Sequence, residues 1–139
     1  MNMLPVDALS FSDPEESVRL RLAEKYLSEA EEYVSRGDAI RASEMAYKAA
    51  EELVKALAER LRTREYQQAQ REGRWYTYML FKAAVTISTS LGRWVLDGWN
   101  SAYSLHVWGF HENKLDVEEV KTAMEKIKQM LEETKRVLP

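Results

Sequence analysis

The central helix of this chain is predicted by residues 38–62, which read DAIRASEMAYKAAEELVKALAERLR. Small and apolar residues recur at spacings of three and four, which is the period of one helix face. That face consists of Ala42, Ala46, Ala49, Ala50, Leu53, Val54, Leu57 and Leu61. Alanine lets a neighbouring helix backbone approach closely, so we expect this helix in the middle of a bundle. Its polar face includes Glu59 and offers Glu44–Lys48 and Glu51–Lys55 pairs, each worth about 0.2–0.5 kcal/mol.

The preceding residues predict a second helix that pairs with the first. Ser12 and Asp13 compete as N-caps of a helix that continues to about Ser35, and with Asp13 as the cap Pro14 stands at the first helical position, where proline is tolerated. Gly37 is placed to end that helix in a left-handed conformation, and Asp38 caps the next one. We therefore expect a tight antiparallel hairpin.

The rest of the chain also favours helices. Residues 63–74 are polar and are either a continuation of the central helix or a surface loop. We expect helices over 75–89 and 93–107, with Gly98 inside the latter as a sign of close packing or a kink. Gly109 is expected to open the following turn.

The last helix is expected to begin after Asp116, with Glu119 completing a capping box. Its apolar stripe is Val120, Met124, Ile127, Leu131 and Leu138, interrupted by Thr134. Such a stripe packs lengthwise on neighbouring helices or on the same helix of a second subunit. The predicted fold is an all-α antiparallel four- or five-helix up-and-down bundle.

Composition limits the class of protein. The 139 residues suit an N-terminal arm (1–11) and one bundle domain (12–139), with ordinary fractions of hydrophobic (45%) and charged (31%) residues. The absence of cysteine excludes disulfides and thiolate metal sites, and fits a reducing compartment. A net charge of −3 argues against an obligate polyanion binder but allows a local basic patch. We see no signal peptide and no membrane span, and expect a cytoplasmic protein.

The two histidines, His106 and His111, are the candidate catalytic residues. Two side chains on one face of an α-helix need a spacing of three or four, so a spacing of five requires the helix to end between them. Gly109 is the candidate end. A metal site with Asp97 or Glu112 is a further possibility, although our prediction is no metal and no cofactor. The simpler interpretation is one histidine at a helix C-terminus and one packed or exposed.

Aromatic and basic residues give a second set of candidates. Tryptophans and tyrosines gather between residues 75 and 110, either as a stacking platform for bases or as large core residues. Arg93 and Trp108 are the candidate nucleotide-binding residues. The most basic segment either contacts phosphates or forms a solvated helix end, and it comprises Arg60, Arg62, Arg64, Arg71 and Arg74.

Two segments carry a family resemblance. The chain resembles the archaeal PaREP family of small helical proteins in two motifs. These are GD…ASEMAYKAA…VKALAE, which begins at Gly37, and LHVWGFHE, which begins at Leu105. The resemblance implies a bundle of the HEPN type, the nucleotide-binding domains of higher eukaryotes and prokaryotes. It also implies a homodimer, and a relation to the subunits that partner minimal nucleotidyltransferases.

Many HEPN proteins are metal-independent ribonucleases in which an arginine is followed, after four to six residues, by a histidine. His111 matches that histidine, whereas Leu105–Val107 contain no arginine and His106 stands at the four-residue spacing. The resemblance therefore implies three functions. These are a nucleotide- or RNA-associated module, a ribonuclease of the toxin–antitoxin kind that uses both histidines, and a non-catalytic partner subunit of a nucleotidyltransferase.

Overall fold

A computed structural model describes residues 14–138, and this part of the chain is helical with no strand. The elements are α2 (Pro14–Ser35), α3 (Ala39–Leu61), α4 (Arg64–Glu72), α5 (Thr77–Leu91), α6 (Arg93–Ser104), η1 (Leu105–His111) and α7 (Val117–Val137). The predicted N-terminal arm and the Asp13 cap lie outside the described residues.

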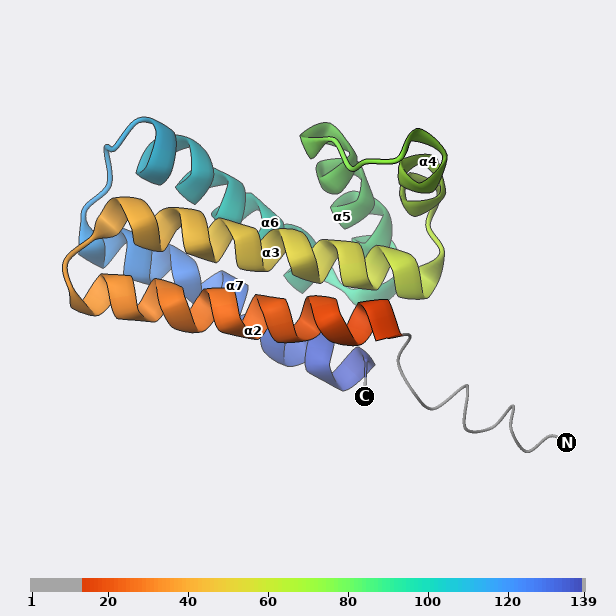
Figure 1. The fold of residues 1–139 in the computed structure, drawn as a ribbon, viewed down its shortest axis with the longest axis horizontal. Coiled ribbons are helices and arrows are strands. Elements are labelled where there is room, and N and C mark those ends of the chain that lie inside the picture. The colour runs from red at the N-terminus through yellow and green to blue at the C-terminus, as the bar shows by residue number, and fades with distance from the viewer. Residues whose placement is uncertain (1–13, 139) are drawn as a thin grey trace, which may run out of the picture.

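Four long segments run alternately up and down: α2, α3, α6 continued by η1, and α7 (Figure 1). The shorter helices α4 and α5 are inserted between α3 and α6 and lie at one end of the bundle (Figure 1). The structure therefore confirms the predicted all-α up-and-down bundle.

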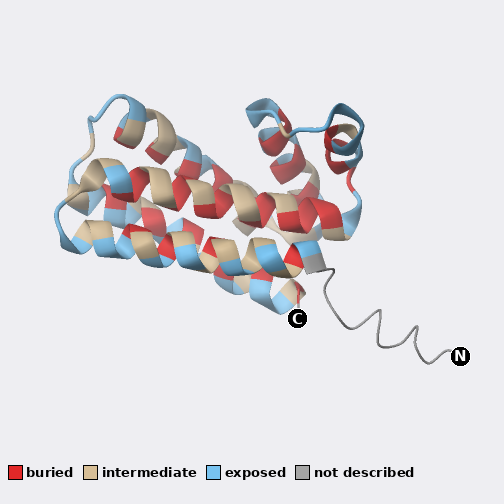
Figure 2. Ribbon diagram, in the orientation of Figure 1, coloured by how far each residue is buried: buried red, intermediate tan, exposed pale blue. Residues whose placement is uncertain are grey.

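Buried residues follow α3 along its length (Figure 2), as the alanine-rich face predicts. Two details of the prediction are wrong. Leu61, at the last position of α3, is 39% exposed, because left-handed Arg62 ends the helix there. Glu59 is buried rather than solvated and lies 3.8 Å from Arg19 Nε of α2.

Ion pairs join α2 to α3 along the polar edge of their hairpin. Arg19 contacts Glu52 at 3.1 Å, and Arg60 contacts Glu16 at 3.3 Å, with the Glu16 side chain almost fully buried. Partly buried pairs are screened less by salt than exposed ones. They therefore fix the register of the hairpin more firmly than the surface pairs predicted within α3.

Most helix ends follow local chemistry. Gly37 has φ 77°, and the Asp38 carboxylate accepts a hydrogen bond from the amide of Arg41 at 3.0 Å. Asp116 and Glu119 form the predicted capping box. Residues 63–74 are neither a continuation of α3 nor a loop, because the Thr63 hydroxyl accepts from the amide of Tyr66 and starts the separate helix α4.

Substituting phenylalanine for Ala46 or Ala49 is expected to destabilise the fold. Both residues are fully buried on α3, so the larger ring overpacks the core at a cost of about 1–3 kcal/mol or more. The midpoint of urea unfolding measures the change, and Lys126→Phe on the exposed face of α7 is the control for the added ring. An unchanged midpoint for Ala46→Phe would mean that this face is open.

The apolar stripe of α7 is used within the chain itself. Leu131 is 8% exposed and belongs to the core, so Leu131→Glu is expected to weaken the fold of the single chain. Thr134 is fully buried and its hydroxyl donates to the carbonyl of Met130 at 2.6 Å, which explains how a polar residue interrupts the stripe. No described helix is long and apolar enough to span a membrane.

Candidate functional site

The histidine segment is a π-helix. Helix α6 passes at Ser104 into η1, in which backbone hydrogen bonds join residues five apart, and the amide of Glu112 continues this pattern by donating to Val107 at 2.9 Å. Residues five apart therefore share one face. The prediction that a helix must end between His106 and His111 is wrong, and so is the expected turn at Gly109, because the helix widens instead of ending.

Gly109 fixes η1 against α3. A Cβ atom at this position would overlap the Ser43 hydroxyl and lie 2.7 Å from Ser43 Cβ, so only glycine allows the observed approach. Ser43 is itself fully buried, and its hydroxyl donates to the carbonyl of Ala39 at 2.8 Å. This contact brings the polar face of α3 next to the two histidines.

A hydrogen-bonded chain of three side chains results. Glu44 Oε1 lies 3.0 Å from His106 Nδ1, and His106 Nε2 lies 3.2 Å from His111 Nε2. Because a carboxylate only accepts, it favours the tautomer in which His106 carries its proton on Nδ1. In that tautomer the Nε2 atom of His106 is an acceptor, and His111 Nε2 donates to it. The side chains of Glu44 and His106 are 19% and 22% exposed, whereas His111 is at the surface.

Aromatic rings hold His106 in place. Its ring stacks on Tyr47 with 4.0 Å between centroids, and Tyr103 and Phe110 lie 6.1 and 6.2 Å away. Burial raises the pKa of the Tyr47 hydroxyl, and the nearby Glu51 carboxylate raises it further. Tyr47 therefore stays protonated at neutral pH and acts as a stacking surface and hydrogen-bond donor, not as a proton acceptor.

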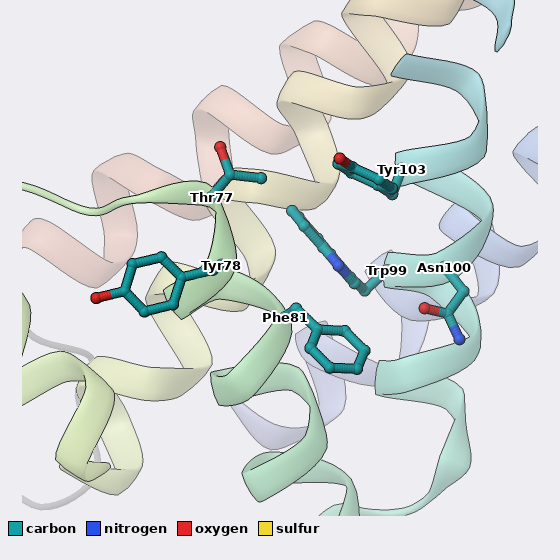
Figure 3. A pocket seen from close by; sticks show the side chains of 6 residues that line it. All are labelled: Thr77, Tyr78, Phe81, Trp99, Asn100 and Tyr103. Carbon is teal, nitrogen blue, oxygen red and sulfur yellow. The ribbon is translucent and has the colours of Figure 1, made fainter. Parts of the chain in front are cut away.

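Beside this group lies an aromatic pocket between α5 and α6, with a volume of about 560 Å³ (Figure 3). Its lining residues are Thr77, Tyr78, Phe81, Trp99, Asn100 and Tyr103. Tyr47 links the pocket to the histidines. Its ring centroid lies 5.6 Å from that of Trp99 and 6.5 Å from that of Tyr103, and it also stacks on His106. The volume is in the range of about 300–1,000 Å³ that small-molecule sites occupy.

Of the other predicted site residues, Arg93 lies far from the histidines, and Trp108 lies between them in η1. Arg93 is the first residue of α6, roughly 20 Å from His106 along the helix at 1.5 Å per residue, and it pairs with Asp97 at 3.6 Å. Trp108 belongs to η1 and is 52% exposed. Within residues 14–138, histidine and carboxylate side chains form no group of three suited to a metal ion.

Sequence reasoning missed the contribution of α3. Glu44 was expected to pair with Lys48, but Glu44 contacts His106 and the Lys48 ammonium lies over the Tyr26 ring at 6.0 Å. The available signal was the row Glu44, Tyr47 and Glu51, whose spacings of three and four put one aromatic and two acidic residues on one helix face.

Fold and site together define an all-α bundle that carries a carboxylate-supported histidine pair on a π-helix. The model of the archaeal PaREP1/PaREP8 family matches residues 18–131. The chain belongs to this archaeal family.

Two solved structures are similar to this chain in sequence and fold. A crystal structure of a protein from Sulfolobus solfataricus is 38% identical, with a TM-score of 0.77 over 84% of this chain and 96% of that chain. A solution structure of the same structural-genomics target is also 38% identical, with a TM-score of 0.69 over 78% of this chain and 84% of that one. The chain matches none of the curated proteins.

Proposed function

We propose that this protein binds RNA and cleaves it without a metal ion. The observation that supports this most directly is the chain Glu44–His106–His111, with contacts of 3.0 and 3.2 Å. Two adjacent imidazoles can act as a proton acceptor and a proton donor, which is what general acid–base catalysis of phosphodiester cleavage requires. The implied HEPN-type bundle, a homodimeric state and a cytoplasmic location belong to the same proposal.

His106 is assigned the role of general base. Its Nε2 removes the proton of a ribose 2′-hydroxyl, while Glu44 stabilises the imidazolium through Nδ1–H. The 2′-oxygen forms a bond to phosphorus as the bond from phosphorus to the 5′-oxygen breaks. His111, as general acid, gives its proton to the departing 5′-oxygen. The products are a 2′,3′-cyclic phosphate and a free 5′-hydroxyl.

This mechanism requires the two imidazoles to part when RNA binds, since the attacking and leaving oxygens lie on opposite sides of the phosphorus. His111 is suited to that movement because it is exposed and is the last residue of η1. The half-buried His106, held by Glu44 and by stacking on Tyr47, keeps its place.

The test is cleavage of end-labelled, mixed-sequence RNA in the presence of a chelator. Wild-type protein is expected to produce fragments ending in a cyclic phosphate, and His111→Ala is expected to lose this activity by a factor of about 10²–10⁴. Glu112→Gln, an exposed change next to His111, is the matched control and should cleave like wild type. Equal cleavage by wild type and His111→Ala would show a contaminating nuclease, and no cleavage by wild type would contradict the proposal.

A second candidate function is a non-catalytic partner subunit of a nucleotidyltransferase. It draws on the exposed apolar side chains of α5, where Tyr78, Phe81 and Val85 share one face at spacings of three and four. For such a subunit the histidines are dispensable, so His111→Ala would bind the partner as wild type does. Phe81→Ser would instead abolish the complex in sedimentation of the two purified proteins.

A further inference from the structure

We infer that the substrate is single-stranded RNA, which lies in extended form from a basic hollow beside α4, across the aromatic pocket, to the histidine pair. The inference rests on the proposed function, since it concerns the same site. It adds the strandedness of the RNA and the path that the strand follows, and the residues of that path lie outside the histidine chain.

The basic hollow is lined by Arg64, Glu65, Gln68, Arg71 and Lys82 and has a volume of about 330 Å³. The other arginines of the basic segment are engaged elsewhere: Arg60 pairs with Glu16, and the guanidinium groups of Arg62 and Arg74 lie over tyrosine rings.

Three cations and one carboxylate therefore surround the hollow. The Glu65 side chain is 4% exposed and accepts from Thr86 Oγ1 at 3.1 Å and from Arg64 Nε at 3.4 Å. The accessible surface of the hollow is thus positive, although the whole chain has a net charge of −3. Local positive charge of this kind binds the phosphates of nucleic acids.

Tyr78 joins the hollow to the aromatic pocket. It lines the pocket, and its hydroxyl accepts a hydrogen bond from Gln68 Nε2, a group of the hollow, at 3.4 Å. The Lys82 ammonium, also of the hollow, lies 5.8 Å from the centre of the Tyr78 ring. Figure 3 shows the Tyr78 hydroxyl directed away from Tyr103 and from the rest of the pocket.

Tyr103 joins the pocket to the histidines at the other end. It lines the pocket and lies 6.1 Å from His106 between ring centroids. In space, the basic hollow is therefore followed by the aromatic pocket and then by the histidine pair. Tyr78 forms the first connection and Tyr103 the second. This arrangement supplies the phosphate-binding cations that the histidine segment lacks, since Leu105–Val107 contain no arginine.

The aromatic pocket selects unpaired bases. Phe81 and Tyr103 are 47% and 43% exposed, and each offers a ring face on which a base stacks. Asn100 adds an amide that donates to and accepts from the edge of a base. A base in a duplex is stacked on its neighbours and paired on that edge, so it cannot enter. Aromatic platforms next to cationic grooves are the usual means of holding single strands.

The experiment measures binding without cleavage. A fluorescent 2′-O-methyl RNA of about 12 nucleotides lacks the attacking hydroxyl, so wild-type protein can be titrated with it directly. The unpaired strand is expected to bind at least tenfold more tightly than the same strand annealed to its complement. Phe81→Ala is expected to weaken binding of the single strand roughly 5- to 100-fold, and Val18→Ala, an exposed apolar side chain of α2, is the control.

Salt dependence tests the basic hollow. Replacing Arg71 and Lys82 together by glutamine is expected to reduce the slope of log K against log salt by about 1.4, which is about 0.7 for each lost phosphate contact with a single strand. Lys126→Gln, an exposed change on α7, should leave the slope unchanged. Circular dichroism verifies that each variant is folded.

The inference is overturned if duplex and single strand bind equally, or if the variants of the hollow and the pocket bind as wild type does. It is also overturned if Phe81→Ala converts a dimer to a monomer in sedimentation while RNA affinity is unchanged, because that face would then be a subunit contact. If cleavage depends on His111 but neither the preference for single strands nor the loss of binding in the variants is seen, the proposed ribonuclease function is retained and the RNA path is rejected. Selective single-strand binding without cleavage supports the path and rejects the catalysis.

Discussion

Replacing His106 by glutamine is expected to lower the rate of RNA cleavage by about two to four orders of magnitude. Glutamine cannot exchange a proton at neutral pH, but its amide can still donate to Glu44 Oε1, which lies 3.0 Å from the imidazole in the wild type. Single-turnover rates with end-labelled RNA measure the loss, and the urea midpoint checks the fold. A variant that cleaves within threefold of wild type would contradict the role of His106 as base.

Glu44 is a positioning residue for His106 rather than a catalytic one. Glu44→Gln removes the negative charge that fixes the tautomer and orientation of the imidazole, so we expect kcat to fall by about 10² while KM stays constant. Glu118→Gln, an exposed carboxylate of α7, is the control. An increase in KM with unchanged kcat would assign Glu44 to RNA binding instead.

Gly109→Ala is expected to lower the free energy of unfolding by about 1–3 kcal/mol or more. The added methyl group would lie 2.7 Å from Ser43 Cβ and overlap the Ser43 hydroxyl, and both groups are in the buried contact between η1 and α3. The helix must move away from α3, which also withdraws His106 from Glu44. Urea unfolding and the cleavage assay together measure both effects.

A double-mutant cycle separates this clash from a general effect of alanine. Ser43→Gly alone is expected to cost about 1 kcal/mol, because glycine is unfavourable inside a helix. If the two positions touch, the double variant is more stable than the sum of the single changes predicts, with a coupling of about 0.5–3 kcal/mol. Strict additivity would mean that Gly109 does not pack on Ser43.

Much of the fold could be predicted from the sequence because its helix ends obey local rules. Gly37 and Asp38, and later Asp116 and Glu119, act through atoms within a few residues of themselves. The burial of the alanine-rich face of α3 could likewise be predicted from the helical spacing of its small residues. Close packing at Gly98 is also confirmed, since a Cβ there would lie 2.9–3.0 Å from atoms of Met130 on α7.

The candidate site was predicted only in part, because it depends on contacts between distant segments. The two histidines were identified from residue type, but their pairing rests on a π-helix that the spacing rule for α-helices excludes. The contact of Gly109 with Ser43 brings together residues 66 positions apart, by the numbering of the chain. Glu44 looked like one more surface carboxylate until that contact placed it beside His106.

The π-helix also means that this segment contains an additional residue. An α-helix keeps side chains four residues apart on one face, whereas η1 does the same for residues five apart, so this segment contains one residue more than an α-helix needs to pair the same groups. Trp108, between the histidines and 52% exposed, is the residue whose removal costs the core least. With one residue fewer between them, the two histidines would stand four apart, which is the spacing that an ordinary α-helix keeps on one face.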